Sequence, residues 1–216
     1  MKAVIFDMDG VLLDSEKAHY EAVRRVLARR GIFLTFKEWK RDYPGRPDAE
    51  AFFYVLKMGK GEAEKLAGEK QKILVRIAGS LAKPFKPTIA AAERLCAEGY
   101  ALALGTSAAS NEAAALLRRF GLKRLFPIVV TAEDVKRGKP APDIYLLAAK
   151  KLKAKPKDCV VVEDSIMGVE AAKRAGIRCV AVTHTFPRKL LRRADAIVDD
   201  RGAGGSKKLF KAIAEQ

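Results

Sequence analysis

Two acidic side chains near the N-terminus could do chemistry together. Asp7 and Asp9 directly follow the apolar run Ala3 to Phe6, which predicts a short strand buried on both faces. Open α/β sheets keep their sites at the carboxyl ends of strands, and Gly10 allows a sharp turn there without a side chain. The pattern favours Mg²⁺-assisted phosphoryl transfer, with Asp7 as the nucleophile and Asp9 as the acid and base. A single Asp-x-Asp pair is not specific, so the other parts of such a site must come from elsewhere in the chain.

Hydroxyl groups follow a second predicted strand. The apolar run Tyr100 to Leu104 leads into Gly105, and Thr106, Ser107 and Ala108 come next. A hydroxyl at a strand end, beside the free amides at a helix start, can hold a phosphate group. The alternative is that Thr106 or Ser110 merely caps the next helix.

A lysine held between prolines offers positive charge. Lys139 follows Gly138, and Pro140 and Pro142 restrict the backbone after it. Such a lysine could neutralise a phosphate group beside carboxylates. The alternative is an ordinary lysine exposed on a loop.

A third predicted strand ends in acids. The run Cys159 to Glu163 is rich in valine, and Asp164 follows it directly before a helix. Mg²⁺ prefers hard oxygen ligands and usually takes one or two protein carboxylates. Asp164 could be the second carboxylate, with Glu163 as a further ligand or as a partner to a metal-bound water. The alternative is that these acids only favour the start of the helix.

Strands and helices alternate through most of the chain. Helices are expected over 109–120, 142–153, 166–175 and 206–214, and strands over 100–104, 127–130, 159–163, 178–182 and 195–198. This alternation implies parallel strands joined by right-handed crossovers. Residues 1–15 and 82–216 are therefore predicted to form a three-layer α/β/α, Rossmann-like core with a parallel sheet.

Residues 16–81 show helical patterns without a strand signal, and we expect them to form an inserted, all-helical cap. Its helices are predicted to begin after Ser15 and to cover Phe36 to Tyr43, Ala49 to Leu56 and Glu62 to Leu81. The following Lys83 to Pro87 holds two prolines and predicts a stiff return segment.

Composition narrows the class of protein. Of 216 residues, 49% are hydrophobic, which is ample for a core. Three cysteines, without zinc or disulfide spacing, are typical of a reducing cytosol. No apolar run is long enough to span a membrane, and the N-terminal strand does not have a signal-peptide layout. We expect a soluble, cytoplasmic protein that is a monomer or a weak dimer.

The net charge of +16 has two readings. Clustered Lys and Arg would favour nucleic-acid binding, whereas dispersed charge could attract small anionic substrates. The basic residues are spread over many helices, and the one dense run, Arg188 to Arg193, predicts an amphipathic helix. Nucleic acid is therefore not expected as a partner.

Four segments together resemble a known family. Their order is Phe6-Asp7-Met8-Asp9-Gly10, Thr106-Ser107, Gly138-Lys139-Pro140 and Glu163-Asp164-Ser165. This order resembles the motifs of the haloacid dehalogenase (HAD) superfamily. A small helical insertion directly after the first motif resembles the branch that contains phosphoglycolate phosphatase and β-phosphoglucomutase.

The resemblance implies roles for these residues. Asp7 would attack phosphorus to form an aspartyl-phosphate, and Asp9 would protonate the leaving alkoxide and then activate water. Thr106 and Lys139 would hold the transferred phosphoryl group, and Mg²⁺ would be bound by Asp7, the Asp9 backbone carbonyl and Asp164. Cleavage of a carbon–halogen bond needs neither Asp9 as an acid nor a metal, so a dehalogenase does not fit. The candidate metal ligands are Asp7, Asp9, Glu163 and Asp164.

The predicted cap must decide the substrate. His19 could act as a hinge or relay group near Asp9, or it is a partly solvated helix histidine. Arg46 could bind a distal anionic group, but Asp48 stands where the mutase pattern has an arginine. The favoured function is a Mg²⁺-dependent phosphatase of a small phosphate monoester, the alternative is a hexose-phosphate mutase of the β-phosphoglucomutase type, and a catalytically idle nucleic-acid-binding domain is a third hypothesis. The candidate substrate contacts are Gly10, His19, Arg46, Ser107 and Ala108.

Overall fold

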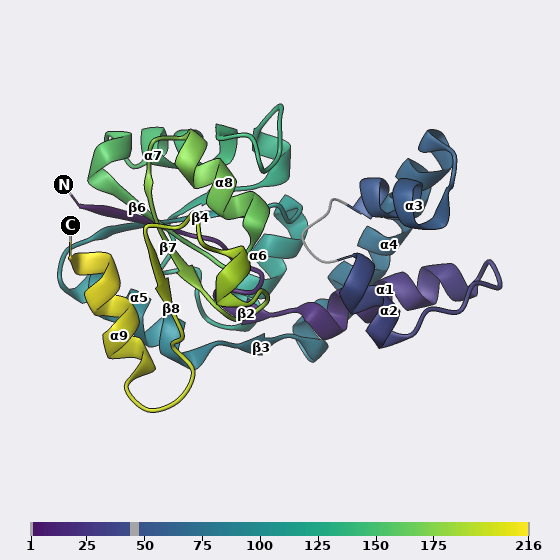
Figure 1. The fold of residues 1–216 in the computed structure, drawn as a ribbon, viewed down its shortest axis with the longest axis horizontal. Helices are drawn as coiled ribbons and strands as arrows, with labels where there is room; N and C mark the ends of the chain where they lie inside the picture. The colour runs from purple at the N-terminus through teal and green to yellow at the C-terminus, as the bar shows by residue number, and fades with distance from the viewer. Residues whose placement is uncertain (1, 44–47, 216) are drawn as a thin grey trace. The chain divides into compact units, whose positions relative to one another are not determined.

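The computed structural model describes residues 2–43 and 48–215. The chain divides into two compact units, Met1–Asp14 with Lys83–Gln216, and Ser15–Ala82. We call the first the α/β unit and the second the helical unit (Figure 1).

The α/β unit is built on one parallel sheet of six strands. In spatial order these are β5 (Ile128–Val130), β4 (Ala101–Gly105), β1 (Ala3–Phe6), β6 (Cys159–Glu163), β7 (Arg178–Val182) and β8 (Ala196–Val198). Strand β1 is central and fully buried, and it places Phe6 opposite Leu104 of β4 and Val162 of β6. Strands buried on both faces explain why their sequences are continuous apolar runs.

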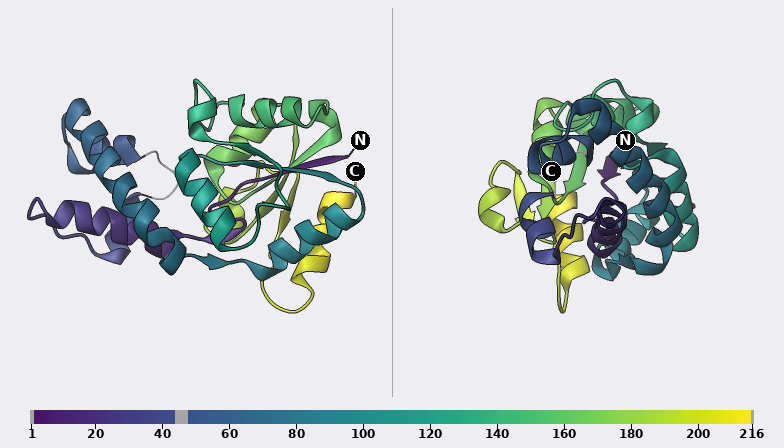
Figure 2. Two further views of the ribbon diagram at one scale, coloured as in Figure 1. Left: turned by 180° about the vertical axis from the view of Figure 1, so that it is seen from behind. Right: turned by 90° about the vertical axis from the view of Figure 1, so that its right-hand side faces the viewer.

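Helices cover both faces of this sheet (Figures 1 and 2). Helices α7 (Asp143–Lys151) and α8 (Ile166–Arg174) lie on one face, and α5 (Lys86–Ala97) and α9 (Gly205–Ala214) lie on the other. Helix α6 (Ser110–Arg119) follows β4, and three short 3₁₀ helices complete the unit: η1 (Ala132–Asp134), η2 (Pro156–Asp158) and η3 (Arg188–Leu190). The predicted three-layer α/β/α architecture with a parallel sheet is confirmed.

The described part of the helical unit contains only helices. They are α1 (Glu16–Ala28), α2 (Phe36–Asp42), α3 (Asp48–Leu56) and α4 (Lys60–Leu81). Helix α2 begins with a capping box, in which the Thr35 hydroxyl accepts a hydrogen bond from the Glu38 amide and Glu38 accepts one from the Thr35 amide. The unit has its own apolar core, which includes Trp39, Phe52 and Leu66.

Two segments differ from expectation. The start of the return segment forms a strand, β3 (Lys83–Pro84), which pairs antiparallel with β2 (Leu13–Asp14). The prediction of an amphipathic helix over Arg188 to Arg193 was wrong, because only the 3₁₀ helix η3 forms there. The chain must turn after the buried Leu191, since Asp195 already pairs with Cys179 through both its amide and its carboxylate at the start of β7.

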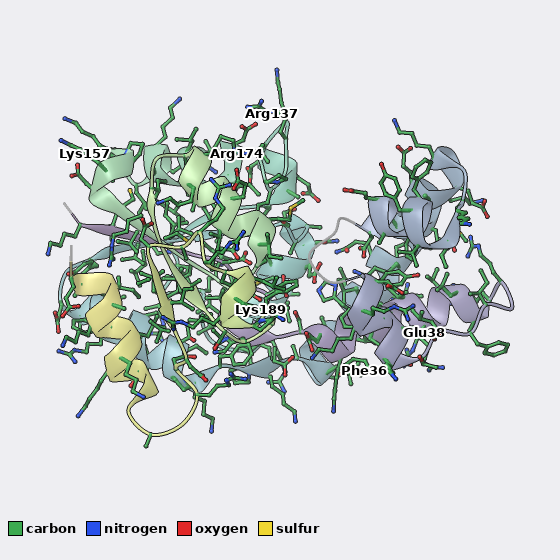
Figure 3. All side chains as sticks on the ribbon, viewed as in Figure 1. Phe36, Glu38, Arg137, Lys157, Arg174 and Lys189 are labelled. Atoms are coloured by element: carbon green, nitrogen blue, oxygen red, sulfur yellow. The ribbon has the colours of Figure 1, made fainter. Side chains whose placement is uncertain are left out.

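The surface of the described chain carries dispersed positive charge. Arg137, Lys157 and Lys189 are exposed on three separate loops or short helices, and Figure 3 shows them projecting from different parts of the α/β unit. All three cysteines are free, and only Cys96 is exposed. Within residues 2–43 and 48–215, no helix is both long and apolar enough to cross a membrane.

Candidate active site

The carboxyl ends of β1, β4 and β6 bring the predicted acidic and hydroxyl residues to one edge of the sheet. Because β1 lies between β4 and β6, Asp7, Thr106 and Glu163 leave the sheet at neighbouring positions. The Asp7 amide still donates a hydrogen bond to the Val162 carbonyl at 3.0 Å. Asp7 is therefore held by the end of the ladder and is only 7% exposed.

Lys139 points into this edge from the loop before α7. Its ammonium nitrogen lies 2.9 Å from Asp7 Oδ1 and 2.7 Å from Glu163 Oε1, and its side chain is 6% exposed. It also lies 4.9 Å from the centre of the Tyr145 ring on α7. These contacts exclude the alternative of an ordinary exposed lysine.

Glu163 holds the site together. Its Oε1 accepts hydrogen bonds from Lys139 Nζ at 2.7 Å and from the Tyr145 hydroxyl at 2.6 Å. Its Oε2 accepts from the Asp164 amide, the Ser165 amide and the Ser165 hydroxyl, at 2.8 to 3.0 Å. A Cβ atom at Gly168 would lie 1.6 Å from Oε1, so the start of α8 must be glycine here for Glu163 to fit. Both carboxylate oxygens are thus occupied by donors of the protein.

Gly10 is packed directly against Asp164. Its φ of +74° favours glycine, and a Cβ atom there would lie 1.9 Å from Asp164 Oδ2 and 2.7 Å from the Thr185 hydroxyl. Asp164 is 3% exposed and accepts a hydrogen bond from the Thr185 side chain. Asp9, just before Gly10, is half-buried. The turn after β1 therefore brings Gly10 against Asp164, at the end of β6.

Thr106 is fully buried at the end of β4. Its amide continues the ladder to the Val130 carbonyl, and its hydroxyl accepts a hydrogen bond from the Ala108 amide at 3.1 Å. Ser107 is exposed between them. The N-cap of α6 is Ala109, without a side-chain cap, so neither Thr106 nor Ser110 has the capping role considered above.

Burial and crowding shift the acidity of these groups. The pKa of Asp7 is raised to about 7. Burial is the largest cause, and the charges of Glu163 and Asp9 add to it, while the positive charge of Lys139 opposes the shift. Burial also raises the pKa of Asp164 well above 3.8, and the charges of Glu163 and Asp7 add to that effect. Burial lowers the pKa of Lys139, but the charges of Asp7 and Glu163 outweigh it and hold the pKa above 10.5. Lys139 therefore stays charged.

The residues at this edge fit a divalent cation. Ligand atoms of Asp7, Glu163 and Asp164 lie within 4.8 Å of one another, and the ammonium of Lys139 forms ion pairs with Asp7 and Glu163. Asp7 Oδ1 is buried, and its ion pair with Lys139 does not have hydrogen-bond geometry. Buried carboxylate oxygens that crowd one another in this way suit a small, hard cation such as Mg²⁺.

Two further candidates belong to the helical unit. His19 lies on α1, where its Nδ1 is 2.9 Å from the Nζ of the buried Lys70 on α4. Lys70 also forms an ion pair with Asp48 at 2.8 Å. Arg46 lies outside the described residues. Contact of His19 or Arg46 with a substrate stays a prediction.

Comparisons with known proteins agree with this geometry. A family model described as haloacid dehalogenase-like hydrolase matches residues 1–176. The chain belongs to the haloacid dehalogenase-like hydrolase family. As a member with phosphatase-named relatives, it is a phosphohydrolase.

Individual relatives cover nearly the whole chain. It is 39% identical over 192 residues to a phosphorylated carbohydrates phosphatase of Thermotoga maritima, covering 86% of this chain and 87% of the relative. It is 30% identical over 196 residues to β-phosphoglucomutase of Bacillus subtilis, covering 87% of this chain and 85% of that relative. The solved structure of CbbY from Rhodobacter sphaeroides in complex with phosphate matches with a TM-score of 0.81 and 25% identity, covering 96% of this chain and 99% of the CbbY chain.

Some members of the site in this HAD-like hydrolase were not predicted. Tyr145 lies on α7, and its place within a helical pattern gives no sign of the hydrogen bond that its hydroxyl donates to Glu163. Thr185 comes three residues after the end of β7, at the carboxyl edge of the sheet where functional side chains gather, and this place in the chain is the signal that could have identified it.

Proposed function

We propose that the protein is a Mg²⁺-dependent phosphatase that hydrolyses a small phosphate monoester, with sugar phosphates as the preferred class. The observation that carries this proposal is the burial of Lys139 between Asp7 and Glu163, at the sheet edge that also carries Asp164 and Thr106. A buried ammonium beside a carboxylate nucleophile can neutralise a phosphate group while that group is transferred. The sugar-phosphate class is supported by the 39% identical phosphorylated carbohydrates phosphatase.

In the proposed mechanism, an Asp7 oxygen attacks phosphorus and forms an aspartyl-phosphate while the bond to the ester oxygen breaks. Asp9 gives its proton to the departing alkoxide. Asp9 then takes a proton from water, whose oxygen attacks phosphorus and releases inorganic phosphate and free Asp7. Lys139, Thr106 and the backbone at Ser107 and Ala108 would hold the phosphoryl oxygens, with Gly10 leaving room for their approach.

Asp7, Asp164 and the backbone carbonyl of Asp9 would hold the cation. When bound, Mg²⁺ would reduce the repulsion between the Asp7 carboxylate and the anionic phosphate group. Glu163 has both oxygens engaged by donors. We assign it the role of holding Lys139 and the Asp164 loop in place rather than that of a ligand.

We further propose that residues 16–81 act as a cap on a catalytic core of residues 1–15 and 82–216. His19 and Arg46 would contact the leaving group of the substrate. The mutase alternative has support from the 30% identical β-phosphoglucomutase. Against it, Asp48 forms an ion pair with the buried Lys70, and its negative charge is poorly suited to a second phosphate group.

A panel of sugar phosphates and other metabolite phosphates tests the proposal. We expect phosphate release from some members of the panel that needs Mg²⁺ and is lost in the D7N variant. Equal activity of D7N and wild type would refute the role of Asp7. Conversion of β-glucose 1-phosphate to glucose 6-phosphate without release of stoichiometric phosphate would favour the mutase.

A further inference from the structure

We propose that His184 is a positioning residue for the catalytic loop, and that it fixes the backbone carrying Asp9 through the carbonyl oxygen of Gly10. This inference rests on the proposed phosphatase function. His184 belongs to none of the four motifs that carry the family resemblance. It follows β7, on the far side of β6 from β1.

The contacts of His184 define its ring orientation. Its side chain is 2% exposed, and Nδ1 lies 2.8 Å from the Gly10 carbonyl oxygen. Because a carbonyl oxygen only accepts, Nδ1 must carry a proton. Nε2 lies 2.5 Å from Asp200 Oδ1, and the other oxygen of the buried Asp200 accepts a hydrogen bond from Thr88 at 2.8 Å. The Phe85 ring stacks on the imidazole at 3.8 Å between ring centres.

The Gly10 carbonyl is a sensitive point of the site. Gly10 joins Asp9 to the turn that ends at Leu13. The Leu13 carbonyl accepts a hydrogen bond from the Gly10 amide at 2.8 Å. On its other side Gly10 has no room for a Cβ atom beside Asp164. A shift of Gly10 would therefore displace Asp9 and change the space around Asp164 together.

Two consecutive residues, His184 and Thr185, bind the two sides of the contact between Gly10 and Asp164. His184 holds Gly10, and the next residue, Thr185, hydrogen bonds to Asp164. A buried polar pair such as His184–Asp200 is weak evidence of a role in stability, because apolar residues of similar volume are often as stable. Orientation of the backbone between Asp9, the proposed acid and base, and Asp164, a proposed metal ligand, gives the pair a function that apolar residues could not supply.

Two substitutions separate this role from packing. H184F keeps the ring that stacks on Phe85 but loses the donor to Gly10. H184N loses the ring that stacks on Phe85, but its side-chain amide nitrogen takes the place of Nδ1 and can still donate a hydrogen bond to the Gly10 carbonyl. D195N is the matched control, since Asp195 accepts hydrogen bonds from Cys179 and Lys173 at the opposite end of β7.

Steady-state kinetics and calorimetric titration with Mg²⁺ alone give the readouts. For H184F we expect kcat to fall about 10- to 100-fold and Mg²⁺ binding to weaken about 10-fold. H184N is expected to lie within about 10-fold of wild-type kcat, although it is the less stable of the two. D195N is expected to lower the melting temperature while leaving kcat and Mg²⁺ binding unchanged.

A kcat for H184F equal to or above that of H184N would show a packing role and overturn the proposal. The ¹⁵N spectrum of the imidazole rings tests the contact without any assay of activity, because the chain has two histidines and the His184 signals are those lost in H184N. A protonated Nδ1 is expected, and a bare Nδ1 would overturn the proposal even where H184F does not fold. A wild type that neither binds Mg²⁺ nor releases phosphate would refute the proposed function instead.

Discussion

Replacing Asp7 by asparagine is expected to stabilise the metal-free protein at pH 8 while abolishing turnover. The pKa of Asp7 is about 7, against an ordinary value of 3.8. The folded state therefore binds this proton more tightly than the unfolded chain does, so the free energy of unfolding falls as pH rises from about 4 to about 7. At roughly 1.4 kcal/mol per pH unit, ionised Asp7 costs the fold about 4 kcal/mol at pH 8. Asparagine has a similar shape and stays neutral, so D7N avoids this cost.

Urea unfolding followed by circular dichroism in EDTA measures the difference. We expect D7N to exceed wild type by about 4 kcal/mol at pH 8, and the gain to vanish near pH 4. Saturating Mg²⁺ is expected to raise the stability of wild type more than that of D7N. D195N is the control of opposite sign. Partial burial raises the pKa of Asp195, but hydrogen bonds from Lys173 and the Cys179 amide outweigh burial and bring the pKa below its ordinary value. The ionised Asp195 therefore stabilises the fold at pH 8, and D195N is expected to weaken it. A D7N variant no more stable than wild type at pH 8 would refute the electrostatic account of the site.

Further predictions concern three other residues. K139M leaves buried carboxylates without their counter-charge, so we expect a stability loss of about 3 to 5 kcal/mol in urea unfolding and a kcat about 10²- to 10³-fold lower; a kcat within twofold of wild type would contradict its role. G10A combines a positive φ with a clash against Asp164, and we expect it to cost about 2 to 5 kcal/mol in thermal unfolding; an unchanged melting temperature would show that the loop can move away. D9A is expected to slow alkyl phosphates far more than aryl phosphates, whose leaving groups need no proton, and equal losses on the two substrates would argue against Asp9 as the acid.

Positions at strand ends could be predicted from the sequence because a buried strand is a continuous apolar run, and the chemistry begins where that run stops. Asp7, Thr106 and Asp164 all follow such runs, and the structure places their strands side by side. His184 and Thr185 also follow a buried strand, β7, but they were not predicted because neither belongs to a motif that suggests chemistry.

Tertiary packing decided what the sequence left open. The burial of Lys139 depends on the Tyr145 ring and Glu163, which α7 and β6 bring from other parts of the chain. The engagement of Glu163 by donors has a mixed origin: Lys139 and Tyr145 reach it through tertiary packing, whereas the donors of Asp164 and Ser165 come from the local turn into α8. The helical reading of Arg188 to Arg193 failed because Leu191 and Asp195 are bound to the core, which local periodicity does not record.

In the proposed mechanism, Asp7 becomes covalently phosphorylated during turnover. The most direct test of this step is rapid acid quench of the wild-type protein during turnover of a sugar phosphate from the active panel, followed by mass spectrometry of the N-terminal peptide. We expect a phosphoryl group on Asp7 in wild type, more of it in a variant that slows hydrolysis of the intermediate, such as D9A with an aryl phosphate, and none in D7N. Continued turnover with the phosphoryl group on another residue, or with the D7N variant, would contradict this mechanism.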